Sequence, residues 1–159
     1  MMLVEKTKNL KRDFTATGYV INPTKTKILV VFHKKLQKWI PAGGHIEPNE
    51  LPHEAALREV FEETGVSAQI LSDDPDIELN GIIDCQIPRP YSILYQVIPQ
   101  SSKDQEHIHV DFIYTMMAAE SELKISSTEV TDVKWLTKNE ILALNCFDSV
   151  KGFVKNYLK

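Results

Sequence analysis

Three glutamates, Glu59, Glu62 and Glu63, stand close together in the sequence at a spacing that suits a metal ion. In an α-helix, residues at i, i+3 and i+4 lie on one face, so this spacing would gather three mutually repelling carboxylates. Hard divalent cations such as Mg²⁺ and Mn²⁺ prefer oxygen ligands, and a bound cation offsets that repulsion. Because Mg²⁺ commonly binds phosphate oxygens together with a few carboxylates, the pattern indicates a di- or polyphosphate substrate.

The alternative for these glutamates is an ordinary solvent-exposed helix face, because their repulsion costs only about a few tenths of a kcal/mol per pair. The neighbouring residues argue against that alternative. Gly43 and Gly44 permit a close backbone approach. Glu50 adds another carboxylate, and Arg58 can pair with Glu62 four residues later.

The glutamates require a helix, and residues 52–64 carry the clearest helix signals in the chain. Pro52 suits the first helical position, Glu54 lies in the first turn, and Gly65 provides a stop. Leu51 stands where a capping Ser, Thr or Asp is expected. The stripe that we expect to be buried consists of Ala56, Leu57, Val60, Phe61 and Thr64.

Segments rich in β-branched and aromatic residues surround this helix. Strands are predicted at residues 13–21, 27–33, 39–40, 66–71, 77–87, 91–98, 108–117 and 130–136. Asn22-Pro23 separates the first two and predicts a hairpin. Thr137 and Glu140 form a capping box for a short helix, and apolar residues recur at helical spacing from Phe147 to Leu158. This order favours an α/β fold with a mixed sheet covered on both faces.

The size and charge of the chain narrow its class. A length of 159 residues favours a single domain over residues 1–159, and a net charge of −4 gives no strong signal for nucleic-acid binding. No run approaches the roughly 18 apolar residues of a membrane span, and the first residues lack the apolar core of a signal peptide. Cys85 and Cys146 are interpreted as reduced thiols. We therefore expect a soluble cytoplasmic protein with no membrane partner, and a homodimer is compatible with this composition.

From Gly44 to Val66 the sequence resembles the Nudix box, G-x5-E-x7-R-E-U-x-E-E-x-G-U with U aliphatic. Gly44, Glu50 and the run from Arg58 to Val66 match this pattern without a mismatch. A chance match has a frequency on the order of 10⁻⁸ for average composition. The looser resemblance extends from about Phe14 to about Leu142.

The resemblance implies the Nudix fold, an α/β/α sandwich with a mixed β-sheet and a loop-helix-loop metal site. It also assigns roles by position in the box. The implied ligands of Mg²⁺ or Mn²⁺ are Glu59, Glu62, Glu63 and the carbonyl oxygen of Gly43. Arg58 and Glu50 would orient these carboxylates.

The activity implied by the resemblance is that of a Nudix-type pyrophosphohydrolase, a pyrophosphatase that acts on acid anhydrides. Such enzymes hydrolyse a phosphoanhydride bond in a nucleoside diphosphate linked to another group, or in a nucleoside triphosphate, by attack of water on phosphorus. The alternative is a nucleotide-binding sensor or interaction module without turnover, and the complete set of box carboxylates argues against it. The general base is open between a box glutamate and a later residue, of which the candidates are Glu129, Glu120, Glu122 and Asp132.

Residues outside the box give weaker indications about the substrate. The proline that follows the box in many ADP-ribose hydrolases is absent, since Gly81 and Ile82 occupy that region. His107 and His109 alternate along a strand, and we interpret them as a polar strand face. Lysines near the second strand either steer an anionic substrate or form a solvated hairpin tip: Lys34, Lys35 and Lys38. Aromatic residues that either stack on a base or fill the core are Tyr91, Tyr95 and Phe112.

Overall fold

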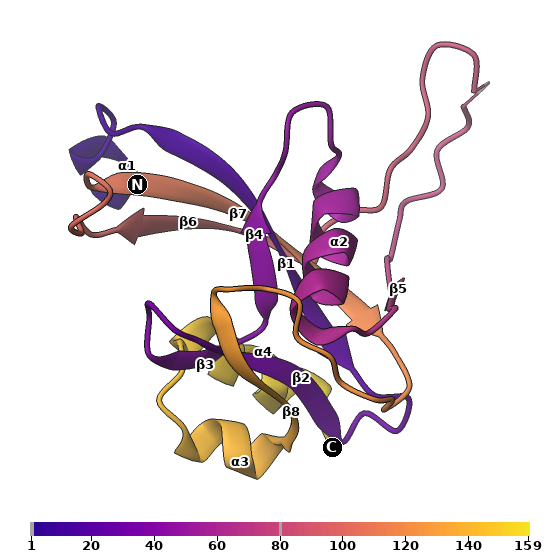
Figure 1. Cartoon of the computed structure of the whole chain (residues 1–159). Coiled ribbons are helices and arrows are strands. Elements are labelled where there is room, and N and C mark those ends of the chain that lie inside the picture. Colours follow the sequence, from indigo (N-terminus) through magenta and orange to yellow (C-terminus); the bar gives the residue numbers. More distant parts are fainter. Residues whose placement is uncertain (1, 80) are drawn as a thin grey trace.

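The computed structural model describes residues 2–79 and 81–159 and contains an eight-stranded mixed sheet (Figure 1). The strands are β1 (Arg12–Ile21), β2 (Lys27–His33), β3 (Lys38–Ile40), β4 (Ala42–His45), β5 (Gln69–Ile70), β6 (Ser92–Ile98), β7 (His107–Met117) and β8 (Val130–Thr137). The helices are α1 (Met2–Lys6), α2 (Pro52–Thr64), α3 (Lys138–Ala143) and α4 (Asp148–Tyr157).

The centre of the sheet is the parallel pair β1 and β7, and the remaining strand pairs are antiparallel. β1 pairs with β4 over Thr15–Gly18 and with β2 where Ile21 faces Ile28. The predicted hairpin of β1 and β2 is therefore present, although the two strands diverge quickly. β2 continues as the partner of β3 and β8. The strand β4 thus lies beside the middle of β1, where it packs against α2.

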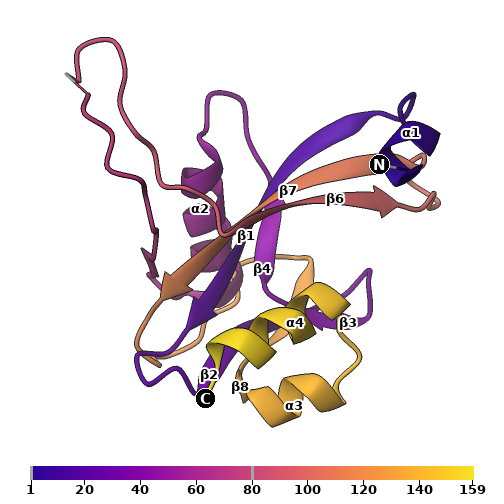
Figure 2. The same ribbon diagram turned by 180° about the vertical axis from the view of Figure 1, so that it is seen from behind.

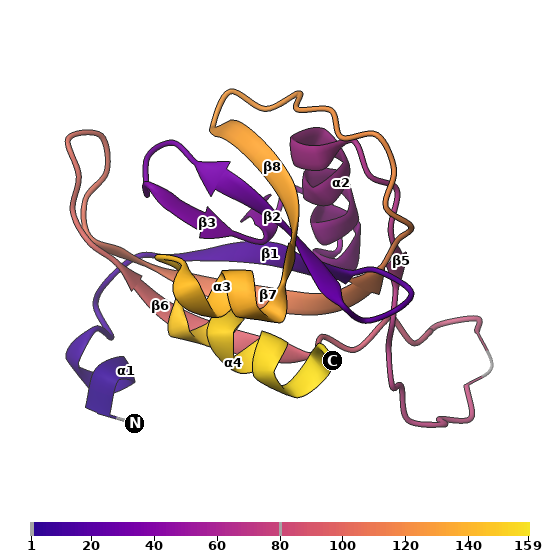
Figure 3. The ribbon, with the colours of Figure 1, turned by 90° about the horizontal axis from the view of Figure 1, so that it is seen from below.

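Two apolar clusters lie on opposite faces of the sheet. On one face, Ala16 and Val20 of β1 belong to the same buried cluster as Val60 of α2. On the other face, Tyr19 belongs to a cluster with Phe153 of α4, which lies in front of the sheet in the reverse view (Figure 2). Viewed from below, α2 and the pair α3 and α4 lie on opposite sides of the strands (Figure 3). The predicted α/β class with both faces covered is confirmed.

The helix α2 begins and ends as its sequence predicts. The Leu51 backbone N–H donates to Oε2 of Glu54 at 2.9 Å, which supplies a cap that the Leu51 side chain cannot. Gly65 has φ +74°, and its N–H donates to the carbonyl of Phe61 at 2.8 Å. The predicted buried stripe is wrong in part, because Phe61 is 56% exposed. The helix packs with Ala55, Ala56, Val60, Glu63 and Thr64 buried.

The predicted strand at 77–87 is wrong. Its described residues form an irregular loop between β5 and β6 that projects beside α2 (Figure 1), and residue 80 lies outside the described part. The apolar side chains that suggested a strand are largely exposed, with Ile83 at 88%. β5 is also shorter than the predicted 66–71, and α1 was not predicted. The apolar residues of this run do not keep the alternation of a strand, since Ile82 and Ile83 are adjacent and Gly81 precedes them.

Candidate active site

Arg58 on α2 donates hydrogen bonds to carboxylate and carbonyl oxygen atoms of both the helix and the loop that precedes it. Its Nε and Nη2 donate to the two carboxylate oxygens of Glu50 at 2.8 and 3.0 Å. Its Nη1 donates to Glu59 at 2.7 Å and to Glu62 at 3.4 Å, and Nη2 also donates to the carbonyl of His45 at 3.0 Å. The hydrogen bonds from Arg58 lower the pKa of Glu50. A bidentate arginine of this kind fixes the orientation of both partners, so Arg58 ties the loop after β4 to the helix.

The two glycines of β4 allow α2 and β1 to come close. Gly43 is paired with Thr17 and Gly44 with Ala16 on β1. A Cβ at Gly43 would lie 2.5 Å from Oγ1 of Thr17 and 2.7 Å from the carbonyl oxygen of Ala16. A Cβ at Gly44 would overlap the carboxylate of Glu59. Any side chain at either position would therefore force a neighbour to move, and the close approach predicted for this pair is confirmed.

Two of the predicted ligand carboxylates are shielded from solvent. Glu63 is only 3% exposed, and its Oε2 accepts a hydrogen bond from the N–H of Gly43 at 3.3 Å. Burial, together with the nearby charge of Glu59, raises the pKa of Glu63 to about 8. Burial also raises the pKa of Glu59, although the hydrogen bond from Arg58 opposes this. Both pKa values are shifted in the direction expected where carboxylates lack a sufficient counter-charge.

Glu62 lies further out than the other two. Its side chain is 51% exposed and leans toward Arg58. In the described part of the chain, the carboxylates of Glu59, Glu62 and Glu63 do not form a group whose ligand atoms all lie within 4.8 Å of one another. An exposed side chain can rotate at little cost, so Glu62 can turn toward the buried pair. The donor set, all oxygen with partial exposure to water, fits a hydrated hard cation better than a closed cage.

A cavity of about 1100 Å³ opens on the far side of β4 from Glu59. Both glycines of β4 line it, together with residues from β1, β6 and β7, the turn before β3, and the start of α4. This volume accommodates a nucleotide-sized ligand. The box carboxylates and the cavity are thus separated only by the glycine backbone of a single strand.

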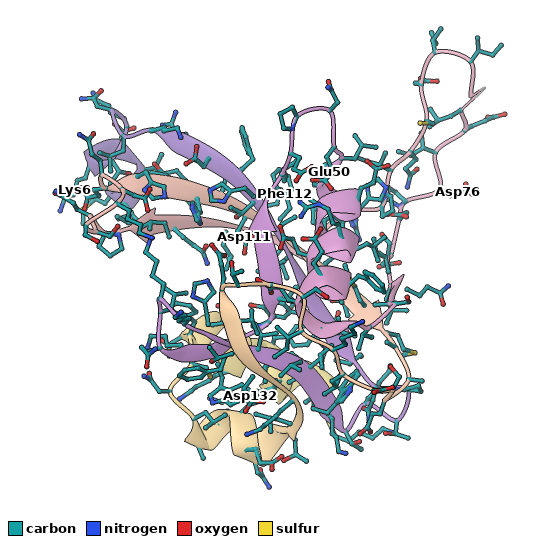
Figure 4. The ribbon with its side chains drawn as sticks, in the orientation of Figure 1. Lys6, Glu50, Asp76, Asp111, Phe112 and Asp132 are labelled. Atoms are coloured by element: carbon teal, nitrogen blue, oxygen red, sulfur yellow. The ribbon has the colours of Figure 1, made fainter. Side chains whose placement is uncertain are left out.

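The cavity wall carries polar residues that the sequence did not single out. Asp111 of β7 is buried, accepts from the hydroxyls of Thr15 and Thr17 at 2.9 Å each, and lies close to β4 (Figure 4). Burial raises the pKa of Asp111, while the two threonine hydroxyls lower it. The alternation His107, His109, Asp111 was the available signal, because a period of two places all three on one strand face.

Comparisons with known proteins agree with this geometry. A model of the NUDIX domain matches residues 12–156, which is most of the chain. This chain belongs to the Nudix family. A Clostridium perfringens hydrolase of the NUDIX family has a similar structure, with a TM-score of 0.72, 28% identity, and coverage of 93% of this chain and 97% of that one. The motif at residues 44–66 of this chain is its Nudix box.

Two curated relatives match shorter stretches. A probable DHNTP pyrophosphohydrolase of Lactococcus lactis is 26% identical over 63% of this chain and 52% of its own length. A putative 8-oxo-dGTP diphosphatase of Bacillus subtilis is 41% identical over 36% of this chain and 39% of its own length. The matches therefore span about half or less of each curated relative.

The structure separates the four candidates for a general base outside the Nudix box. Glu129 lines the cavity, and its carboxylate lies 3.8 Å from Nε2 of His33. Its charge also contributes to the raised pKa values of Glu59 and Glu63, after burial and closer groups. The other three candidates are absent from the described lining of the cavity: Glu120, Glu122 and Asp132.

Those three residues have other surroundings. Glu120 is held by Lys27 at 2.8 Å and by the side-chain amide of Asn22 at 2.9 Å. Asp132 pairs with Lys134 at 3.0 Å on β8, away from the Nudix box (Figure 4). Glu122 is exposed in the segment before β8. Geometry therefore favours Glu129 among the four.

The structure also shows which of the lysines and aromatic residues noted in the sequence line the cavity. Lys35 and Lys38 line the cavity, but Lys35 pairs with Asp104 at 3.0 Å and Lys38 donates to Asn145 at 2.7 Å. The three aromatic residues form packing contacts or hydrogen bonds elsewhere: Tyr91 with Phe153 and Tyr157, Tyr95 with Thr7, and Phe112 with Phe14. None of the three lines the described cavity, so they do not provide a stacking platform there.

No helix in the described part of the chain is long and apolar enough to cross a membrane.

Proposed function

We propose that the protein is a divalent-metal-dependent hydrolase that cleaves a phosphoanhydride bond in a nucleoside triphosphate or in another nucleoside diphosphate-linked substrate. One observation carries this proposal. Two Nudix-box carboxylates, the buried Glu63 and the half-buried Glu59, lie against the two glycines of the strand that walls a nucleotide-sized cavity. Carboxylates at a site that raises their pKa bind a divalent cation with relief of that electrostatic penalty.

The residues that would hold Mg²⁺ or Mn²⁺ are Glu59, Glu62, Glu63 and the carbonyl oxygen of Gly43. Such an ion would neutralise charge on the phosphate oxygens while water attacks phosphorus. Arg58 cannot take over that task, because its guanidinium is already engaged by Glu50 and by the carbonyl of His45. We assign Arg58 and Glu50 to orienting the carboxylates rather than to binding substrate.

Glu129 is the group that we propose as the general base. Its carboxylate is exposed at the cavity, where it can accept a proton from the attacking water. His33 accepts a hydrogen bond at Nδ1 from the N–H of Leu36, so its other nitrogen carries the proton and faces Glu129. The new P–O bond forms as the bridging P–O bond breaks, which releases a nucleoside monophosphate and either pyrophosphate or a phosphorylated remainder.

The substrate class rests on cavity size and on the relatives. Both curated relatives carry names of enzymes that hydrolyse phosphoanhydrides, and 8-oxo-dGTP is a nucleoside triphosphate. The deciding experiment is a panel of NTPs, dNTPs, nucleotide sugars, ADP-ribose, dinucleoside polyphosphates and 5′-triphosphorylated RNA, assayed with and without Mg²⁺. We expect metal-dependent turnover of at least one compound. A folded protein that turns over none of them would contradict the proposal.

The alternative, a nucleotide-binding module without turnover, is not favoured. Its usual cause would be lost box carboxylates, whereas here all of them are present. Calorimetry distinguishes the two functions. Nucleotide binding without any product formed over hours would support the binding module.

A further inference from the structure

A second group of metal-ligating side chains lies on the cavity face of the sheet, outside the Nudix box. Asp13 of β1 and His107 and His109 of β7 each offer one ligand atom, and these atoms all lie within 4.8 Å of one another. The parallel register pairs Asp13 with His109, and the strand period of two brings His107 to the same face. The cluster is thus built from two rigid neighbouring strands rather than from a loop.

The distance between the two imidazoles is the distance that one shared ion would require. Nε2 of His107 lies 3.2 Å from Nε2 of His109. Two nitrogen ligands at about 2.0–2.1 Å from a tetrahedral zinc ion lie about 3.3–3.4 Å apart. The ring nitrogens are therefore already at coordination spacing.

A hydrogen bond to the backbone orients His107 for a metal. Nδ1 of His107 lies 2.7 Å from the carbonyl oxygen of Gln105, which makes Nδ1 the protonated nitrogen and leaves the lone pair on Nε2. This second bond, from the other ring nitrogen to a carbonyl, is the usual support of a metal-binding histidine. Nε2 of His109 then donates to this lone pair at 3.2 Å, and its proton moves to Nδ1 of His109 when a metal ion binds.

Asp13 supplies the negative charge. Its carboxylate pairs with Lys11 at 2.8 Å, and that lysine is 76% exposed, so the pair can exchange for a metal bond at little cost. His45 completes the surroundings, with Nε2 at 3.9 Å from Asp13 and its ring centroid at 5.0 Å from that of His109. The group as a whole is rich in nitrogen, unlike the all-oxygen Nudix box.

We propose that Asp13, His107 and His109 form a second metal site, for a borderline transition-metal ion such as Zn²⁺ rather than for Mg²⁺. Imidazole ligands suit Zn²⁺, whereas Mg²⁺ prefers oxygen donors. The site faces the cavity, and three protein ligands would leave one position of a tetrahedral ion open toward it. The Nudix-box carboxylate of Glu59 lies behind Gly44, on the other face of β4, so the two sites do not share ligands.

The test is calorimetric titration of the full chain with Zn²⁺ after chelator treatment, with the Nudix box kept saturated by excess Mg²⁺. We expect one Zn²⁺ per chain. His107→Gln and His109→Gln should each weaken this binding at least about 10–100-fold, since second-shell changes alone have effects of this size. Glu63→Gln should leave it unchanged, and His53→Gln on α2 serves as the control for loss of a histidine. Melting in chelator checks that each variant folds.

Substitution by Co²⁺ provides a second readout, because a low-coordinate ion with imidazole ligands absorbs visible light much more strongly than a hydrated octahedral ion. We expect a visible band in wild type and in Glu63→Gln that is lost in His107→Gln. If His109→Gln fails to fold, Asp13→Asn takes its place. Absence of Zn²⁺ binding, binding unchanged in the histidine variants, or binding abolished by Glu63→Gln would each overturn the second site. None of these outcomes depends on turnover, so they leave the proposed hydrolase activity untouched.

Discussion

Glu59 on α2 occupies the space into which a side chain on Gly44 of β4 would project, so that a Cβ there would overlap its carboxylate. The obstructing atoms are the far end of a flexible side chain, which can move. For Gly43, by contrast, the obstruction includes the backbone carbonyl of Ala16 at 2.7 Å. The two adjacent glycines therefore have different physical roles.

Gly44→Ala should reduce Mg²⁺-dependent turnover with little loss of stability, because the Glu59 carboxylate shifts away. We expect at least about a 10-fold loss of activity, as for other displaced metal-site groups. Gly43→Ala should instead cost about 1–3 kcal/mol of stability, seen as a lower melting temperature. Gly152→Ala in α4 is the control, since nothing lies within 4 Å of its Cβ position. A larger melting shift for Gly44→Ala than for Gly43→Ala would contradict this distinction.

Arg58→Lys should lower turnover at least about 10-fold, because a lysine cannot hold Glu50, Glu59 and the His45 carbonyl at once. The expected signature is a higher Mg²⁺ requirement rather than a change in substrate preference. Arg89→Lys provides the matched control, since the guanidinium of Arg89 pairs at 3.6 Å with the fully exposed Asp73 in the loop between β5 and β6. Equal Mg²⁺ titration curves for the two variants would show that the contacts of Arg58 do not support the metal site.

Glu129→Gln should lower kcat by about 10²–10⁴-fold if Glu129 accepts the proton of the attacking water. Mg²⁺ affinity should stay near wild type, because Glu129 is not among the proposed ligands. Glu120→Gln is the comparison, as Glu120 pairs with Lys27 away from the cavity. A near-normal kcat in Glu129→Gln would show that Glu129 is not the general base and would favour a glutamate of the Nudix box instead.

The metal-free protein should lose stability as pH rises, because of Glu63. Burial raises the pKa of Glu63 from 4.5 to about 8, so between these values the folded state holds a proton that the unfolded state has released. This contribution is fully present below pH 4.5 and is lost as pH rises through about 8.

Glu63→Gln stays neutral and avoids that loss. In chelator, its melting temperature relative to wild type should therefore increase from about pH 5 to about pH 9. At roughly 2–4 °C per kcal/mol for a chain of this size, the change is measurable by thermal melting. A difference that does not vary with pH would show that Glu63 is not destabilised in its charged form.

The sequence predicted the part of the site that is local along the chain. Glu59, Glu62 and Glu63 share a helix, and Pro52 and Gly65 delimit it, so local signals alone predicted that helix, although Glu62 lies further out than the other two carboxylates. Phe61 was misplaced because helical periodicity defines a stripe but does not say which sector the sheet covers. β4, which packs against α2, was not predicted, because two adjacent glycines are more typical of a turn than of a strand.

Contacts between strands that are distant in the sequence could not be predicted from local patterns. The Asp111 network with Thr15 and Thr17 depends on the parallel register of β1 and β7, which no local pattern specifies. The same register brings Asp13 beside His109. Without it, the sequence indicates only that the two histidines share a polar strand face. The strand at 77–87 was predicted wrongly for another reason, because its apolar composition is that of a strand but adjacent Ile82 and Ile83 break the alternation that one buried face requires.

Comparison of Glu62→Gln and Glu63→Gln with Glu54→Gln shows whether the Nudix-box glutamates bind a catalytic divalent cation. Glu54 lies on the same helix but serves as its N-terminal cap, a task that Gln can also perform. The measurement is turnover of a substrate from the nucleotide panel across a Mg²⁺ titration. We expect the first two variants to lose at least about 10–100-fold in metal affinity and turnover, while Glu54→Gln behaves like wild type. Equal activity in all three variants would contradict this expectation.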